Sequence, residues 1–239
     1  MTQTAKLPIV VNGLNYWYGA GEARRQAIFD VSFSIECGNF TVLRGPSGCG
    51  KTTLLTLMGC LRNIQEGSIQ LLGHQLHGTN ASTQEKLRRQ IGFIFQAHNL
   101  HESLTARQNT RMGLQVHGKS GSAARQDAAV THLLTQLGLG DRLDYLPGQL
   151  SGGQKQRVAV ARALVSNPDV VFADEPTAAL DKQAGLQIVR MLKALGQKRG
   201  TTTVMVTHDT RIVELADTII DMEDGRIIRN QIAERKRDE

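Results

Sequence analysis

The sequence predicts an α/β fold with a mostly parallel sheet covered by helices on both faces, an antiparallel β part and an inserted α-helical lobe. Three observations predict it: short apolar runs alternate with helical segments, a glycine-rich turn joins one run to a helix, and an apolar stripe at helical spacing interrupts the alternation. With 239 residues, 40% of them hydrophobic, the chain can bury one sizeable core.

The first part of the chain alternates short apolar runs with turns, which is typical of strands. Strands are expected at 9–11, 28–35, 40–43, 67–73 and 91–95, the last after a charged helix around 84–89. The run at 40–43 leads into the glycine-rich turn and a helix over 51–58. These elements predict the start of an α/β core.

The middle of the chain has a helical pattern from about residue 100 to 150. Val130, Leu133, Leu134 and Leu137 recur at i, i+3, i+4 and i+7, and Gly138 is expected to end that helix. The sequence therefore predicts a helical lobe at about 97–154, inserted between two parts of an α/β core at 7–96 and 155–230. Together they form a single domain over 7–230, followed by a charged tail at 231–239.

After the lobe, strands and helices alternate again. Helices are expected at 158–165, 186–195 and 212–216, strands at 170–173 and 203–207, and a hairpin over 219–228 that turns at Asp224-Gly225. Strands that are separated by helices are mostly parallel and covered on both faces. The same sheet is thus expected to continue through the second half of the chain.

Composition and charge exclude several functional classes. Cys37, Cys49 and Cys60 form no metal-ligand or disulfide pattern, which fits a reducing cytosol. No apolar run approaches the roughly 20 residues that span a bilayer, so any membrane role is expected to require a partner. The net charge is +6, but the basic residues are scattered and aromatics are 4%, so nucleic-acid binding is not expected.

A phosphate-binding loop is predicted between the strand at 40–43 and the helix that follows. Its residues are Gly45, Pro46, Ser47, Gly48, Cys49, Gly50, Lys51 and Thr52. Glycines let the backbone amides point at phosphate oxygens, and the helix adds its positive N-terminal end. We expect Lys51 to reach the β- and γ-phosphates, Thr52 to ligate Mg²⁺, and Thr53 to join the nucleotide-binding set. A glycine-rich turn without a ligand is the weaker alternative.

Polar residues also follow three later strands, at the sheet edge where ligands collect in α/β folds. Asp174 is expected to bind Mg²⁺, and Glu175 is the candidate general base that polarises the attacking water. His208 is the candidate contact to the γ-phosphate, and Gln96 the candidate sensor of Mg²⁺ and water. The other histidines, His98 among them, are interpreted as ordinary surface or core residues.

A second anion-binding helix end is predicted at the segment Leu150-Ser151-Gly152-Gly153-Gln154, which we call the signature segment. Ser151 can cap a helix whose first turn exposes several amides through the two glycines. One nucleotide does not need two such cradles from one small subunit. The economical interpretation is that the segment completes the site of another copy, so that two chains sandwich two ATP molecules.

These motifs and their order resemble the ATPase subunits of ABC transporters, over about residues 7–230. The resemblance implies a RecA-like P-loop NTPase core that hydrolyses ATP with Mg²⁺ and drives transport across a membrane. It implies that Tyr18 stacks on adenine, with Tyr16 and Trp17 as alternatives, and that Asp181 helps couple the two sites of a homodimer. It also implies that the helical lobe and the loop after Gln96 receive a membrane permease subunit.

Within that family, the chain resembles the macrolide and lipoprotein exporter group at 18–22 and 95–100. More narrowly, Phe95–Leu100, Thr105–Asn109, Ala178–Asp181 and Val206–Asp209 resemble the DevA-type heterocyst glycolipid exporter ATPases. Such exporters imply a peripheral subunit at the cytoplasmic face of the inner membrane, working with a permease, a periplasmic adaptor and an outer-membrane channel. Ala178-Ala179 replaces the Gly-Asn of the wider group, and His101-Glu102-Ser103 is more polar than is usual there.

Two other functional classes are weaker interpretations. A soluble ATPase of the same superfamily, acting on nucleic acid or the ribosome, would carry long coiled coils or a second ATPase domain, which this sequence lacks. A P-loop kinase or GTPase has no use for the signature segment. Co-purification with a permease would favour the transporter, whereas turnover stimulated by nucleic acid would favour the first alternative.

Overall fold

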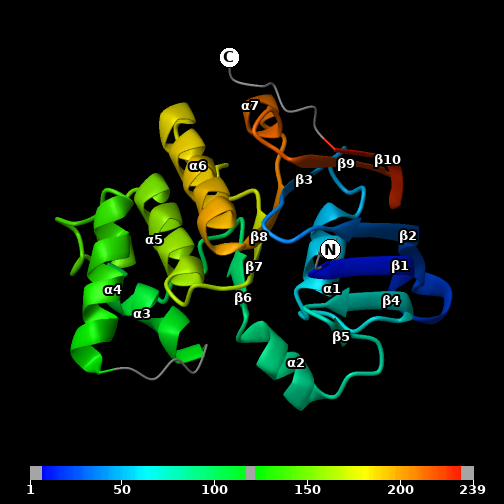
Figure 1. Ribbon diagram of the computed structural model, residues 1–239, viewed down its shortest axis with the longest axis horizontal. Helices are drawn as coiled ribbons and strands as arrows, with labels where there is room; N and C mark the ends of the chain where they lie inside the picture. Colours follow the sequence, from blue (N-terminus) through cyan, green and yellow to red (C-terminus); the bar gives the residue numbers. More distant parts are fainter. Residues whose placement is uncertain (1–6, 117–121, 233–239) are drawn as a thin grey trace, which may run out of the picture.

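The computed structural model describes residues 7–116 and 122–232. The remaining residues include His117 and most of the predicted tail, which therefore lie outside the described part. Two β-sheets and a group of helices make up the fold: the helices α3, α4 and α5 lie on one side, the antiparallel sheet on the other, and the larger sheet between them (Figure 1). The structure confirms the predicted fold class.

The larger sheet has six strands in the order β10-β9-β3-β8-β7-β6. Their bounds are Phe40–Arg44 for β3, Ile91–Ile94 for β6, Val170–Asp174 for β7, Thr202–Val206 for β8, Thr218–Glu223 for β9 and Arg226–Ile232 for β10. All neighbours pair in parallel except β9 and β10, which form the predicted hairpin around Asp224-Gly225. Because β7 and β8 are buried along their whole length, apolar and β-branched side chains fill both faces.

The smaller sheet is antiparallel, in the order β2-β1-β4-β5. Its strands are β1 (Ile9–Tyr18), β2 (Arg25–Ile35), β4 (Glu66–Leu71) and β5 (His74–Gln75), and a short 3-10 turn at Gly21–Ala23 joins the first two. The first strand is much longer than the predicted 9–11. It continues to Tyr18 through register shifts against both neighbours, which the sequence pattern does not reveal because they interrupt the alternation of apolar residues.

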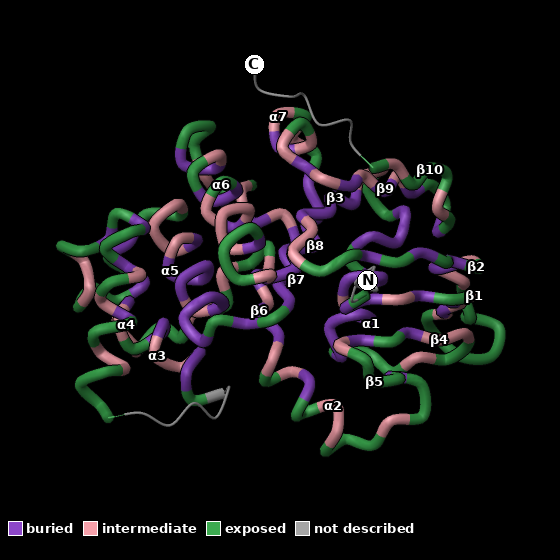
Figure 2. The backbone as a smooth tube through the Cα atoms, viewed as in Figure 1, coloured by how far each residue is buried: buried purple, intermediate pink, exposed green. Residues whose placement is uncertain are grey.

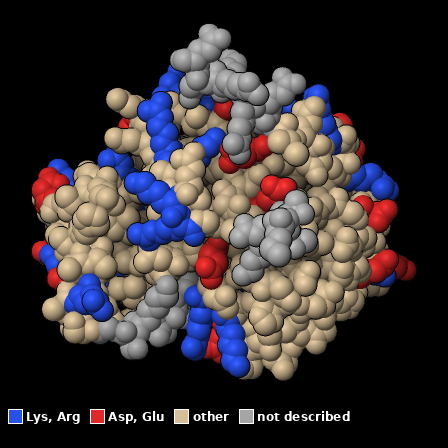
Figure 3. All heavy atoms as spheres, in the orientation of Figure 1, with Lys and Arg blue, Asp and Glu red and all other residues tan. Residues whose placement is uncertain are grey.

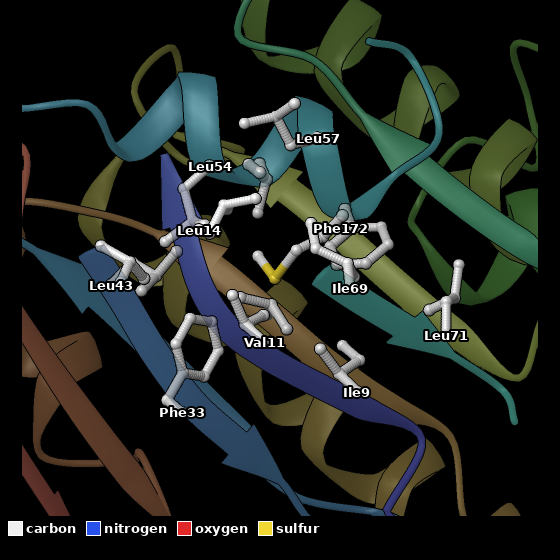
Figure 4. Packing of buried hydrophobic residues seen from close by; sticks show 14 of the residues in the cluster. Ile9, Val11, Leu14, Phe33, Leu43, Leu54, Leu57, Ile69, Leu71 and Phe172 are labelled. Atoms are coloured by element: carbon white, nitrogen blue, oxygen red, sulfur yellow. The ribbon is translucent and has the colours of Figure 1, made fainter. Parts of the chain in front are cut away.

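Helix α1 (Lys51–Met58) lies between the two sheets and joins their cores. Its side chains Leu54 and Leu57 pack with Val11 of β1, Leu43 of β3 and Phe172 of β7 in one buried cluster (Figure 4). Buried residues are concentrated in α1 and in the strands, whereas the outer helices present exposed faces (Figure 2). This packing fixes the helix whose N-terminus follows the phosphate-binding loop.

The helical lobe contains α3 (Ala106–Val116), α4 (Ala123–Gln136) and α5 (Gly152–Leu164), with a short 3-10 turn at Pro147–Gln149. The apolar stripe on α4 faces a second core cluster, and Gly138 (φ 73°) follows the end of this helix as predicted. Helix α5 begins at Gly152, directly after the cap that is predicted at Ser151, although the apolar pattern alone indicates a helix only over 158–165. The division at residues 97 and 154 stays a prediction.

Three further helices complete the chain: α2 (Ala81–Arg88), α6 (Lys182–Arg199) and α7 (Thr210–Val213). Helix α6 is longer than the predicted 186–195 because Asp181 caps it, and α7 is shorter than the predicted 212–216. Strand β10 runs to Ile232, so the first two residues of the predicted tail, 231–232, belong to this strand. None of the helices in the described ranges is long and apolar enough to cross a bilayer.

Candidate functional site

A cleft of about 450 Å³ lies at the carboxyl ends of the parallel strands, beside the N-terminus of α1. It brings together most of the residues that the sequence singles out, which come from the phosphate-binding loop and from the segments after β6, β7 and β8. The lining residues are Ser47, Gly48, Gly50, Lys51, Thr52, Thr53, Gln96, Asp174, Glu175, Val206 and His208.

The backbone of the phosphate-binding loop, residues 45–52, requires glycine. At Gly45 (φ 151°) an added Cβ would lie 2.0 Å from the carbonyl oxygen of Met222, so no side chain fits without moving the backbone. Gly50 caps α1 in a left-handed conformation, with φ 101°. The loop therefore turns tightly against the neighbouring strand and directs the N-terminus of α1 into the cleft.

The ammonium group of Lys51 lies in the centre of this loop. Its Nζ donates to the carbonyl oxygens of Gly45 at 2.8 Å and Pro46 at 2.7 Å, and the side chain is almost fully buried. A positive charge is thus fixed where backbone amides and a helix N-terminus also converge. All three features favour a polyphosphate.

A hydroxyl and a carboxylate meet on the floor of the cleft. The Thr52 Oγ1 atom is 2.9 Å from Asp174 Oδ2, and Asp174 ends the buried strand β7. Burial raises the pKa of Asp174, and the nearby charge of Glu175 raises it further, against the lowering effects of the Thr52 hydrogen bond and Lys51. A divalent cation would offset this cost of a buried carboxylate.

These donors suit Mg²⁺ rather than a metal that is held by protein ligands alone. No group of three or more His, Cys, Asp or Glu side chains converges in the described part of the chain. Mg²⁺ typically takes one or two protein oxygens and fills its remaining positions with water and phosphate oxygens. Thr52, Asp174 and the amide of Gln96 provide oxygens at the same cleft.

Glu175 and His208 form a pair at the mouth of the cleft. His208 Nε2 lies 2.7 Å from Glu175 Oε1, and Glu175 is about one quarter exposed, with 24% of its side chain accessible. Glu175 also has a φ of 46°, in the left-handed region, and its N–H donates to Val206 O at 3.0 Å. A strained backbone that is held by β8 at the residue predicted as the general base is typical of a functional position.

The aromatic candidates at the end of β1 differ in exposure. Tyr16 is 8% exposed and belongs to the core cluster, which removes it as a stacking platform. Tyr18 is 38% exposed, and its hydroxyl lies 2.9 Å from Thr53 Oγ1, close to the cleft. A guanidinium lies over each of the two remaining candidates, that of Arg24 at 4.3 Å from the Trp17 ring and that of Arg62 at 5.0 Å from the Tyr18 ring. The contact with Thr53, which lines the cleft, therefore makes Tyr18 the better candidate for an adenine contact.

The signature segment is not part of this cleft. Ser151 caps α5 in a reciprocal arrangement: the Gln154 N–H donates to Ser151 Oγ at 3.3 Å, and the Ser151 N–H donates to Gln154 Oε1 at 2.9 Å. Ser151 and Gly152 are exposed, and a Cβ at Gly152 would meet nothing within 4 Å. The segment therefore presents a capped helix N-terminus to the outside of the subunit.

Asp181 and His98 have contacts that the sequence did not reveal. The Asp181 side chain accepts hydrogen bonds from the N–H groups of Gln183 and Ala184 and caps α6; these bonds, that of Ala184 first, lower its pKa. Desolvation lowers the pKa of His98, Lys155 lowers it further, and a backbone hydrogen bond of Gly152 raises it. The Asp181 contacts are those of a local helix cap, whereas His98 lies far from Gly152 and Lys155 in the sequence, so no local motif encodes its surroundings.

Comparison with known protein families places the chain among ATP-binding cassettes. The profile of the ABC transporter family matches residues 28–178. An ABC transporter ATP-binding protein of Methanocaldococcus jannaschii is 41% identical over 222 residues, which is 92% of this chain and 98% of that protein. Among solved structures, the ATP-binding cassette MJ0796 as a dimer bound to ADP and Pi aligns with a TM-score of 0.90 at 34% identity, covering 95% of this chain and 99% of that one.

Other relatives are longer proteins named for macrolide export. A MacB protein of Aeromonas hydrophila is 42% identical over 229 residues, and one of a Shewanella species is 43% identical over 222 residues. The matches cover 95% and 92% of this chain but only 34% of each relative. The chain therefore spans about a third of the length of these relatives.

Proposed function

The chain belongs to the ABC transporter family and is an ATP-binding, ATP-hydrolysing subunit, and on this premise we propose that it works as a head-to-tail homodimer that powers a membrane exporter. One observation carries the proposal: the cleft contains the phosphate-binding loop but not the signature segment, which is capped and exposed elsewhere. Each cleft is completed by Ser151 of a second copy, so two ATP molecules hold the dimer closed.

Within one subunit, the phosphate-binding loop and Lys51 hold the β- and γ-phosphates in the cleft. Bound Mg²⁺, held by Thr52 and Asp174 and sensed by Gln96, supplies charge neutralisation for the phosphates. Glu175 accepts a proton from the attacking water. His208, whose Nε2 lies 2.7 Å from Glu175 Oε1, orients that carboxylate, and the His208 ring also contacts the γ-phosphate. The adenine stacks on Tyr18.

The second subunit contributes the N-terminus of α5. The Ser151 Oγ atom accepts from the Gln154 N–H, so its own hydroxyl hydrogen remains able to donate to a γ-phosphate oxygen. Gly152 keeps the first turn of the helix open to that approach, whereas Gly153 lies against the segment before α6. Asp181 holds the start of α6 in place near this segment, since a Cβ at Gly153 would meet Leu180 Cδ2 at 3.2 Å.

The membrane partner is inferred from the relatives and from the sequence, not from the geometry of the cleft. The longer relatives are named macrolide export ATP-binding/permease proteins, which supports export through a permease. The periplasmic adaptor and the outer-membrane channel beyond it are proposed from the resemblance of the sequence to exporter ATPases alone. In this proposal the subunit is a peripheral component at the cytoplasmic face of the inner membrane. Its helical lobe and the loop after Gln96 contact the permease. Phe95–Leu100 and Ala178–Asp181 support the narrower likeness to DevA-type exporter ATPases.

A nucleic-acid- or ribosome-directed ATPase is the second candidate. On the face drawn in Figure 3, Lys and Arg side chains are separated by uncharged and acidic ones rather than forming one continuous patch. This arrangement favours the transporter. Turnover that is stimulated by RNA or DNA, with no permease in the purified complex, would favour the alternative.

Replacing the proposed base tests the mechanism. In Glu175→Gln the cleft keeps its shape but loses the proton acceptor, so ATP hydrolysis falls by about 100-fold or more while ATP binding persists. Size-exclusion chromatography with Mg-ATP should then show an accumulated dimer, and His132→Gln on the exposed face of α4 serves as a control. Normal turnover in Glu175→Gln, or a monomer in Mg-ATP, would contradict the proposal.

A further inference from the structure

Arg62 lies in the segment between α1 and β4, and its guanidinium lies over two aromatic rings at the end of β1. The Arg62 Cζ atom is 5.0 Å from the centre of the Tyr18 ring and 6.0 Å from the centre of the Tyr16 ring. The two rings meet edge to face, with their centres 5.1 Å apart. Because a cation is attracted to the face of an aromatic ring, these three side chains form one group.

Helix α1 fixes the position of this guanidinium. Arg62 Nε donates to Thr56 Oγ1 at 3.2 Å, and Arg62 Nη1 donates to the hydroxyl of Tyr16 at 3.4 Å. The Thr56 hydroxyl is free to accept because it donates its own hydrogen to Thr53 O at 2.9 Å. The guanidinium is therefore held by a helix and by a tyrosine of the core, rather than by solvent alone.

The hydroxyl of Tyr18 is tied to the same helix. It lies 2.9 Å from Thr53 Oγ1, and Thr53 and Thr56 are three residues apart, on one face of α1. The Tyr18 ring is thus held at its hydroxyl by Thr53 and at its face by Arg62. Because α1 begins at Lys51, the ring is fixed to the helix whose first turn faces the phosphates.

Gln65, three residues after Arg62, holds the backbone of the same strand end. Its Oε1 accepts from the Trp17 N–H at 2.8 Å, and its Nε2 donates to Trp17 O at 3.0 Å. Both backbone groups of the residue before Tyr18 are therefore paired with one side chain. Since this pairing does not involve Arg62, a change at Arg62 should affect the direction of the Tyr18 ring and not the course of β1.

The guanidinium reaches the Tyr18 ring from the protein side. Its two hydrogen-bond partners are Thr56 of α1 and the buried Tyr16. Tyr18, by contrast, is exposed, so its ring keeps a surface toward solvent. A base can stack on that surface while Arg62 supports the ring from behind.

We propose that Arg62 is a positioning residue for the nucleotide base, which holds the Tyr18 ring in the orientation in which adenine stacks on it. The inference rests on the proposed contact between adenine and Tyr18. Arg62 is itself exposed and is not among the residues that line the cleft. It therefore contributes to the affinity for ATP and ADP, and not to the chemical step.

Two substitutions at Arg62 are compared in the full chain. Arg62→Met keeps a long side chain but removes the charge and both donors, whereas Arg62→Lys keeps a charge without the planar group. The matched control is Arg226→Met. Arg226 is likewise exposed, its Cζ lies 4.9 Å from the centre of the Phe29 ring, and neither residue lines the cleft.

Affinity for Mg-ADP is measured by calorimetry, because ADP carries the base and is not hydrolysed, and pyrophosphate serves as the probe without a base. For Arg62→Met we expect the Kd for Mg-ADP and the KM for ATP to rise about three- to fivefold, with kcat within about twofold of the wild type. The Kd for pyrophosphate should not change. Arg62→Lys should lie between Arg62→Met and the wild type, and Arg226→Met should match the wild type.

A double-mutant cycle with Tyr18→Ala separates this inference from the stacking on which it rests. Tyr18→Ala alone should raise the Kd for Mg-ADP about tenfold, as for the loss of one stacked base, and adding Arg62→Met should raise it little further. An unchanged or lower Kd in Arg62→Met, an equal rise for pyrophosphate, or additive losses in the cycle would overturn the inference. If Tyr18→Ala bound Mg-ADP like the wild type, the proposed adenine contact itself would fail, and the role of Arg62 with it, which is a different result.

Discussion

The phosphate-binding loop and the signature segment are both glycine-rich turns that lead into a helix, yet they are built differently. The loop at 45–52 is closed by backbone contacts: Lys51 bonds to its carbonyl groups, and Gly45 lies against Met222. The signature segment is closed only by the Ser151–Gln154 cap, and around Gly152 there is open space. The loop is closed within the cleft of its own subunit, whereas the signature segment is open to a partner, as the proposed dimer requires.

This difference teaches what the glycines do in each place. In the loop, Gly45 and Gly50 are needed for the fold, because an added Cβ would collide with a backbone carbonyl oxygen. In the signature segment, Gly152 leaves the helix end open, which the proposed approach of a ligand from outside requires. The two regions should therefore respond differently to the same substitution.

The largest effect is expected from adding one methyl group to each region. Gly45→Ala places a Cβ 2.0 Å from Met222 O and should destabilise the fold by more than about 3 kcal/mol. Gly152→Ala meets nothing within 4 Å and should melt like the wild type, while ATP hydrolysis falls about tenfold or more. Thermal melting and turnover of both variants check this. Equal melting temperatures of the two variants would contradict the proposed difference between the phosphate-binding loop and the signature segment.

Replacing the buried Asp174 should change stability less than Gly45→Ala does, and should raise it. Because its pKa in the fold is raised, its contribution to stability is present below the ordinary value of 3.8 and is lost as pH rises through the higher folded value. Asp174→Asn removes the penalised charge, so without Mg²⁺ or nucleotide it should melt roughly 2 °C or more above the wild type at pH 7. Its ATP hydrolysis should nevertheless be lost.

Measuring both melting temperatures over a range of pH is the control for that prediction. The difference in melting temperature between Asp174→Asn and the wild type should shrink as pH falls, since the wild-type carboxyl is then protonated too. Mg-ATP should stabilise the wild type far more than the variant. A variant that melts lower than the wild type at neutral pH would show that the carboxylate is stabilising, contrary to its burial.

The smallest effect on stability is expected at Ser151, where capping and phosphate contact can be separated. Aspartate caps helices about as well as serine, so Ser151→Asp should leave the melting temperature within about 2 °C. Its negative charge would face the phosphates of the partner's ATP, so hydrolysis should fall at least as far as in Ser151→Ala. Full activity in Ser151→Asp would exclude a phosphate at this helix end.

Much of the cleft could be predicted because its chemistry is local in sequence. Lys51, Thr52 and the glycines stand together, and Asp174 and Glu175 follow one buried strand. Residues whose role depends on tertiary contacts could not be predicted: the register of β1 decides that Tyr16 is buried and Tyr18 exposed, and the contact of His98 with α5 joins distant segments. The start of helix α5 at Gly152 follows from the predicted Ser151 cap, whereas apolar spacing alone indicates a helix only from residue 158.

The central claim is that each catalytic cleft takes Ser151 from the other subunit, and mixing two inactive variants tests it most directly. Lys51→Ala disables the cleft of its own chain, and Ser151→Ala disables the cleft of its twin. A mixed dimer of the two retains one intact site, so equal amounts should recover up to about a quarter of wild-type ATP hydrolysis. If the mixture stays as inactive as either variant alone, the cleft and the signature segment do not meet across a dimer.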